Sequence, residues 1–321
     1  MRFLNFSERH TPWIVAFGLA LFLVGSYQVL FAAPASFIPG SVVTVVRGTS
    51  APLIAEQLAA AHIIKHPLFL RVLLRLSGTS DSVHAGMYRF EKSQNIFSVT
   101  FRLATGAYGL PPVQITFPEG ITVREVAAKI SEALPGVRKQ DFLEEAKKYE
   151  GYLFPDTYLF PPSSDTESII AAMRANFNTK IATLESEIQS SGRSFSDVVI
   201  LASLIEREAR LDVSKRMVAG ILFNRLKLGM PLQVDAVFGY IFDRATYSPS
   251  YADLTVDSPY NTYIHKGLPP GPISNPGLSS LESVLNPTKT NYLYYLTGKD
   301  GLMHYATTYT AHQANRKKYL D

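Results

Sequence analysis

The stretch that most constrains the fold is residues 196–210, SDVVILASLIEREAR, which begins apolar and ends in acid. Four apolar side chains and one acid recur there at spacings of three and four, so that a helix would place them on one face: Val198, Leu201, Leu204, Ile205 and Glu208. Ser196 or Asp197 can cap the helix. A carboxylate that extends a buried stripe loses water, which raises its pKa and suits it to act as a general acid near neutral pH. The alternative is that Glu206 and Glu208 are exposed acids at the end of an ordinary core helix.

Composition limits the classes of function that the chain can have. Its 321 residues give room for two or three domains, and 46% hydrophobic against 18% charged residues allow a large core. The net charge is +4 without a long Lys/Arg run, so we expect no nucleic-acid partner, although a membrane or an acidic polymer would suit this charge. There is no cysteine, which excludes disulfides, thiolate metal sites and a cysteine nucleophile. No His, Asp and Glu spacing predicts a metal site, and we expect no cofactor.

The N-terminus predicts a membrane anchor. Residues 13–33 carry no charge and are long enough to cross a hydrocarbon core of about 30 Å as a helix. Residues 1–12 carry Arg2, Arg9 and His10 against one acid, which predicts a cytoplasmic N-terminus with the rest of the chain across the membrane. A cleaved signal peptide is the alternative. We favour the anchor because the apolar run exceeds a signal h-region and a proline follows the small residues.

Two further units follow in the predicted order of elements. A strand over 41–48, helices over 51–61 and 66–76, a strand over 85–90 and a helix over 96–103 predict a small α+β module, which binds a glycan or acts as a spacer.

The second unit is predicted as a larger α+β domain. It comprises a strand over 113–117, a helix from Thr122 with a capping box to Glu125, helices over 141–149, 163–189, 196–210 and 212–228, a rigid Pro/Gly loop over 267–277, a helical turn over 281–285, strands over 292–296 and 304–306, and a closing helix over 310–320. The helices would form a lobe that carries the acid. The aromatic segment 150–158 is predicted as an irregular loop, which either stacks on sugars or is pinned by buried rings.

Five segments carry information beyond their hydrophobic periodicity, because their residues resemble those of a known family. They are EGYLFPDTY at 150–158, LASLIEREA at 201–209, LFNRLKLGMPLQVD at 222–235, SPYNTY at 258–263 and GLPPGPISNPG at 267–277. Their content and order resemble the membrane-bound endolytic murein transglycosylases, the YceG-like family, and the resemblance extends over roughly residues 41–319.

The resemblance implies a single-pass bacterial inner-membrane enzyme whose catalytic domain faces the periplasm or cell wall. Residues 41–106 would be a LysM-like module and residues 111–321 the catalytic domain. The family cleaves the β-1,4 bond between N-acetylmuramic acid and N-acetylglucosamine in nascent peptidoglycan glycan strands. It leaves 1,6-anhydro ends and is thought to set where polymerisation stops, which implies a complex with a peptidoglycan synthase.

The matching motifs also imply the site residues. The catalytic acid is Glu208 or Glu206, with Glu208 preferred because it lies on the apolar face and precedes the small Ala209. Substrate contacts are implied for six side chains: Gln233, Asp235, Tyr260, Asn261, Tyr263 and Asn275. Ala236 after Asp235 and Gln313 after His312 depart from the family pattern.

One acid suffices for such a lyase, because the C6 hydroxyl of the sugar is the nucleophile. One alternative is a muramidase that uses Glu208 with Asp235 and releases reducing ends. The other is a non-catalytic scaffold that binds peptidoglycan.

Overall fold

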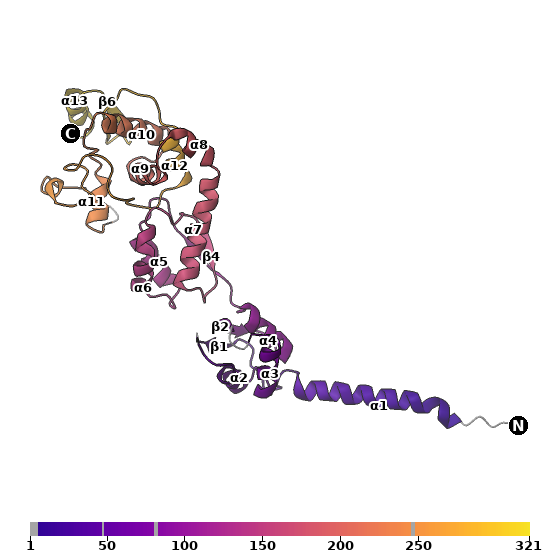
Figure 1. The fold of residues 1–321 in the computed structure, drawn as a ribbon. Helices are drawn as coiled ribbons and strands as arrows, with labels where there is room; N and C mark the ends of the chain where they lie inside the picture. Colours follow the sequence, from indigo (N-terminus) through magenta and orange to yellow (C-terminus); the bar gives the residue numbers. More distant parts are fainter. Residues whose placement is uncertain (1–5, 47, 80–82, 245–247) are drawn as a thin grey trace. The chain divides into compact units, whose positions relative to one another are not determined.

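The computed structural model describes residues 6–46, 48–79, 83–244 and 248–321. Two compact units form the chain, one that runs up to Val113 and includes 160–164, and one that comprises 114–159 and 165–321. Within the described residues the fold is mixed α and β, with many helices and three sheets of two strands each (Figure 1). The predicted α+β class is therefore confirmed.

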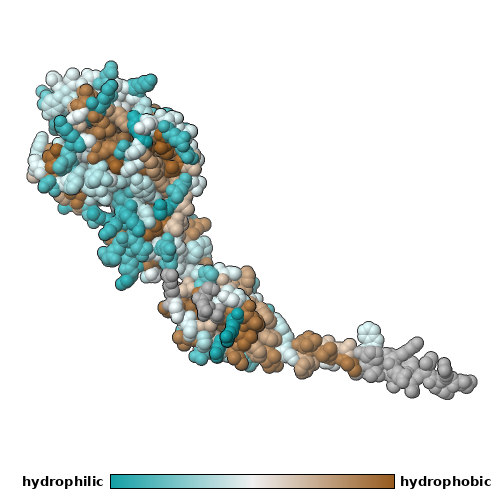
Figure 2. Space-filling model, viewed as in Figure 1, coloured by the Kyte–Doolittle hydropathy of each residue, from teal (hydrophilic) through white to brown (hydrophobic). Residues whose placement is uncertain are grey.

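The first helix, α1, spans Phe6–Leu30 and so begins before the predicted range of 13–33. Large apolar side chains are exposed along it, among them Trp13, Phe17 and Phe22 (Figure 2). Of the helices in the described residues, none combines the length and the mean hydropathy needed to cross a membrane.

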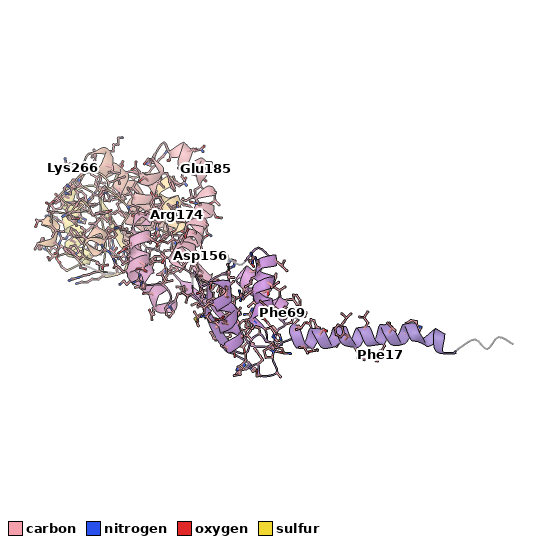
Figure 3. The ribbon with its side chains drawn as sticks, turned by 60° about the horizontal axis from the view of Figure 1, so that its bottom comes forward. Phe17, Phe69, Asp156, Arg174, Glu185 and Lys266 are labelled. Carbon is pink, nitrogen blue, oxygen red and sulfur yellow. The ribbon has the colours of Figure 1, made fainter. Side chains whose placement is uncertain are left out.

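The first unit has the predicted succession of strand, two helices, strand and helix. Its elements are β1 (Ser41–Val45), α2 (Ala51–Ala60), α3 (Pro67–Leu76), β2 (Gly86–Phe90) and α4 (Ile96–Thr105). The strands β1 and β2 are antiparallel, with Ser41 opposite Phe90. Phe31, just after α1, packs its ring 5.4 Å from that of Phe69 on α3 and 5.2 Å from that of Phe97 on α4. Phe69 is labelled in Figure 3. The end of α1 is thus part of this unit.

The second unit contains most of the helices. Its elements are β3 (Val113–Thr116), α5 (Val123–Ala133), α6 (Lys139–Ala146), the 3₁₀ turn η1 (Lys147–Tyr149), β4 (Thr157–Phe160), α7 (Thr166–Ala182), α8 (Glu185–Ser191), α9 (Phe195–Glu208), α10 (Asp212–Lys227), α11 (Ala236–Ile241), the 3₁₀ turn η2 (Asp253–Thr255), α12 (Leu278–Leu285), β5 (Tyr294–Thr297), β6 (Met303–Ala306) and α13 (Tyr309–Tyr319). The capping box between Thr122 and Glu125 is present, as predicted. So is the pairing of the last two strands.

The helix α9 lies at the centre of this unit, beside α10 and α12 (Figure 1). Every residue from Val198 to Ile205 is buried, so the helix is enclosed on all sides and not only on the predicted stripe. Ser194 caps it by accepting a hydrogen bond from the Asp197 N–H, which corrects the predicted cap at Ser196 or Asp197. Burial on all sides fixes the body of α9, and the acids follow in its last turn.

The predicted single helix over 163–189 is two helices, α7 and α8. The Thr183 hydroxyl donates to the carbonyl of Lys180, and Leu184 leaves helical geometry to bury its side chain in the core. The short elements β4 and α11 were not predicted, because each begins within a stretch that is too brief or too punctuated to display a period.

Candidate active site

The last turn of α9 carries two acids with different surroundings. The Glu206 side chain is 6% exposed, and its Oε1 accepts a hydrogen bond from Lys215 Nζ at 2.8 Å. Its Oε2 accepts from the Gly277 N–H and from the Ser280 hydroxyl, each at 2.8 Å. Glu206 thus ties α9 to α10 and to the start of α12, and protein donors occupy both of its oxygens.

Glu208 accepts fewer hydrogen bonds from the protein than Glu206 does, and its side chain remains partly exposed. The Tyr295 hydroxyl donates to its Oε2 at 3.0 Å, and the Ala236 N–H lies 3.4 Å from its Oε1. Burial of the carboxyl group, and secondly the negative charge of Asp235, raise the pKa of Glu208 to about 7, although the two donors act in the opposite direction. A carboxyl group that exchanges its proton near neutral pH meets the requirement for general acid–base catalysis.

Asp235 lies immediately before α11 and is exposed. The Tyr263 hydroxyl donates a short hydrogen bond to its Oδ1. Burial, and then this hydrogen bond, raise the pKa of Tyr263, so that the phenol stays a neutral donor. The structure therefore brings Glu208, Asp235 and Tyr263 together, with Asp235 near enough for its charge to raise the pKa of Glu208.

Gln233 is exposed on the same segment and has a left-handed φ of 50°. Its Oε1 accepts a hydrogen bond from Arg225 Nη1 at 3.2 Å. Arg225 is buried and also donates to the carbonyls of Leu232 and Leu293 at 2.8 and 2.6 Å. Arg225 thus fixes the backbone on which Gln233 and Asp235 stand.

Two of the expected substrate contacts, Asn261 and Asn275, are fully buried in this structure. The Asn261 amide donates to the carbonyls of Leu254 and Val256, and the Asn275 amide donates to the carbonyl of Ile121. Their side chains hold loops in place.

Tyr260 and the aromatic segment are also packed against protein. Tyr260 is half-buried, with its ring 4.9 Å from that of Tyr240. In the segment 150–158, Phe154 is buried and the Tyr152 ring lies 5.4 Å from that of Phe177. These contacts favour a loop pinned by its rings over a sugar-stacking surface.

A comparison with protein families identifies the group to which this arrangement belongs. The family model described as the YceG-like family matches residues 43–318. The chain belongs to the YceG-like family.

Two relatives carry the same name. A Bacillus subtilis protein named endolytic murein transglycosylase is 34% identical over 300 residues, which are 85% of this chain and 83% of that protein. A Streptococcus pneumoniae protein of the same name is 28% identical over 316 residues, 85% of this chain and 57% of that protein. The crystal structure of a putative YceG-like protein from Listeria monocytogenes aligns with a TM-score of 0.59 at 30% identity and covers 85% of this chain and 98% of that one.

The sequence reasoning missed three side chains of this site in the YceG-like chain: Lys215, Arg225 and Tyr295. The sequence does contain a signal for Lys215 and Arg225. Each lies among apolar residues of α10, and a cation on a buried stripe requires a hydrogen-bond acceptor. Tyr295 left no such signal, since its contact with Glu208 joins residues 87 positions apart. Among the described residues, no group of three His, Asp or Glu side chains is arranged to hold a metal ion.

Proposed function

We propose that the chain is an endolytic murein transglycosylase, a lyase that cleaves the β-1,4 bond between N-acetylmuramic acid and N-acetylglucosamine and leaves a 1,6-anhydro end. The observation that carries this proposal is Glu208, a carboxyl group with a pKa of about 7 at the partly open end of α9. The relatives named endolytic murein transglycosylase support the assignment.

In this mechanism Glu208 acts twice. Protonated Glu208 gives its proton to the glycosidic oxygen as the C1–O bond breaks, and the carboxylate then removes the proton of the C6 hydroxyl as C6–O attacks C1. No water is consumed, and the intramolecular attack has a high effective molarity. Gln233, Asp235 and Tyr263 are proposed to line the cleft, and the exposed carboxylate of Asp235 would favour the positive charge that develops on the sugar ring.

Asp235 also supports a second candidate, a muramidase in which it activates water or attacks C1. Mass spectrometry of the products from uncrosslinked glycan strands distinguishes the two. We expect 1,6-anhydro-muramyl ends. Reducing ends would assign the chain as a hydrolase, and intact strands with a folded protein would favour a non-catalytic scaffold.

The pH profile tests the protonation state of Glu208. Because cleavage requires the protonated carboxyl group, kcat/KM should fall about tenfold per pH unit above a pKa near 7. Asp235→Asn removes the negative charge that helps to raise this pKa, so the falling limb should move to lower pH. Asp257→Asn, at another exposed position, is the control and should leave the limb unchanged. A limb that does not move in Asp235→Asn would mean that the charge of Asp235 does not act on the titrating group, and a profile without a falling limb would mean that cleavage does not require protonated Glu208.

We further propose that the enzyme acts in the cell envelope, held in the inner membrane by residues 13–33 with its catalytic domain on the outer side. The exposed apolar side chains of α1 support the anchor, which cosedimentation of the chain with membranes would test. Residues 41–106 are proposed as a LysM-like module that holds the glycan. Partnership with a peptidoglycan synthase and termination of strand growth are proposed on the family role, and crosslinking to a synthase during wall growth would test them.

A further inference from the structure

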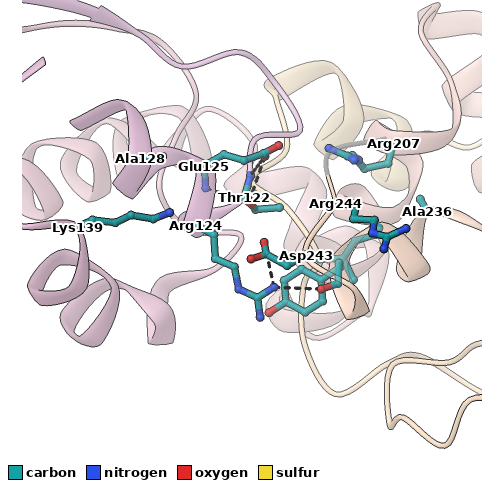
Figure 4. Close-up of a pocket in the computed structure, with 12 residues that line it drawn as sticks. Thr122, Arg124, Glu125, Ala128, Lys139, Arg207, Ala236, Asp243 and Arg244 are labelled. Carbon is teal, nitrogen blue, oxygen red and sulfur yellow. Dashed lines mark hydrogen bonds and ion pairs between the residues drawn. The ribbon is translucent and has the colours of Figure 1, made fainter. Parts of the chain in front are cut away.

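A cavity of about 300 Å³ lies on the flank of α9, in the same unit as the acids (Figure 4). It is bounded by the first turn of α5, the start of α6, and the segment from Ala236 to Arg244. Its charged lining residues come from four separate stretches of the chain: Arg124, Glu125, Lys139, Arg207, Asp243 and Arg244. The cavity therefore has four cations against two acids.

Both acids of the cavity are already engaged. The Glu125 carboxylate accepts a hydrogen bond from the Thr122 N–H at 2.8 Å, within the capping box of α5. Asp243 forms an ion pair with Arg124 at 3.3 Å. Arg124 has donors left for a ligand, since it meets Asp243 and the Tyr240 carbonyl through Nη1 alone and a guanidinium has five N–H donors. Lys139 is exposed and forms no ion pair within the described part of the chain.

The cavity and the proposed catalytic acid are bounded by the same two elements, α11 and the end of α9. Ala236 lines the cavity, and its N–H lies 3.4 Å from Glu208 Oε1. Arg207, which also lines the cavity, directly precedes Glu208 and is fixed by donating from Nη1 to the Gly120 carbonyl at 3.1 Å. The cavity therefore lies beside the segment that contacts Glu208.

We propose that this cavity binds carboxylates of the peptides that branch from the muramic acid residues of the glycan strand. The proposal rests on the proposed function, because only a murein substrate brings a carboxylate-bearing peptide beside the scissile bond. Guanidinium groups match carboxylates in geometry and charge, and Arg124 and Arg207 are already oriented by the protein. The cavity would thus make the enzyme prefer strands that still carry their peptides.

The test compares peptide-bearing strands with the same strands after an amidase has removed the peptides. The Arg124→Gln/Lys139→Gln variant should lose roughly tenfold in kcat/KM on peptide-bearing strands and nothing on stripped strands, since two partly exposed contacts are removed. Lys129→Gln/Lys148→Gln is the matched control, because both lysines are exposed and neither lines the cavity. Equal losses on both substrates, or no loss on either, would overturn the proposal.

Affinity measured in a Glu208→Gln background separates this inference from the proposed function. Peptide-bearing strands should bind about tenfold more tightly than stripped strands, and the Arg124→Gln/Lys139→Gln changes should abolish that difference. If the unaltered chain cleaves neither substrate while this difference in binding holds, the proposed function fails and the peptide site stands. If cleavage occurs without the difference, the peptide site fails alone.

Discussion

Glu208→Gln is expected to lower the rate of glycan cleavage by about 10³-fold or more while leaving the fold intact, because general acid–base catalysis contributes roughly 10²–10⁴-fold. Glutamine keeps the shape of the side chain, and its one carbonyl oxygen can accept from the Ala236 N–H while the Tyr295 hydroxyl turns to accept from the amide NH₂. It cannot supply a proton to the glycosidic oxygen or take one from the C6 hydroxyl. The measurement is the release of anhydro-muramyl products, alongside the thermal midpoint of unfolding.

Glu206→Gln is the matched variant, two residues away on the same helix. We expect it to lower stability, because Lys215 loses its buried partner, while the folded fraction keeps most of its activity. A folded and inactive Glu206→Gln protein beside an active Glu208→Gln protein would reverse the assignment. Activity in both would contradict a single-acid mechanism at this helix end.

The identity of the central helix could be read from the sequence because its signal is local. The spacing of Leu201, Leu204 and Ile205 predicts the helix, and Glu208 extends that spacing to the site that the structure describes. The antiparallel pair near the C-terminus was likewise predictable, since its strands are short, close in sequence and separated by glycines. Local period and turn chemistry are properties of neighbouring residues.

The surroundings of the two acids could not be predicted in this way. Which of the two acids is bound by protein donors on both oxygens depends on Lys215, Gly277 and Ser280. These residues contact Glu206 because α9 packs against α10 and α12. Asn275 belongs to a motif that predicts a substrate contact, and in the structure its amide donates to the Ile121 carbonyl and accepts from the Leu153 N–H, both more than a hundred residues away. A matched motif identifies a residue of interest without identifying its partner. Whether that side chain contacts substrate or the protein backbone depends on long-range packing.

Substitution within the buried ion pair between Lys215 and Glu206 should lower the stability of the catalytic unit strongly. The two side chains are 3% and 6% exposed and 2.8 Å apart, and Lys215 also donates to the Ser279 hydroxyl. Lys215→Met preserves much of the volume but leaves a buried carboxylate without its cation, which costs about 3–5 kcal/mol in free energy of unfolding. Urea unfolding followed by circular dichroism measures this loss.

The matched control is Lys227→Met at the exposed end of the same helix, which should change the free energy of unfolding by less than about 0.5 kcal/mol. The double variant Lys215→Met/Glu206→Leu removes both charges and should recover a large part of the stability, because an apolar pair carries no desolvation penalty. The two single losses would then not be additive. If Lys215→Met is as stable as the unaltered chain, the ion pair contributes no net stability to the fold. The ion pair would then not be what fixes the end of α9, and the geometry of Glu208 would rest on Tyr295 and α11 alone.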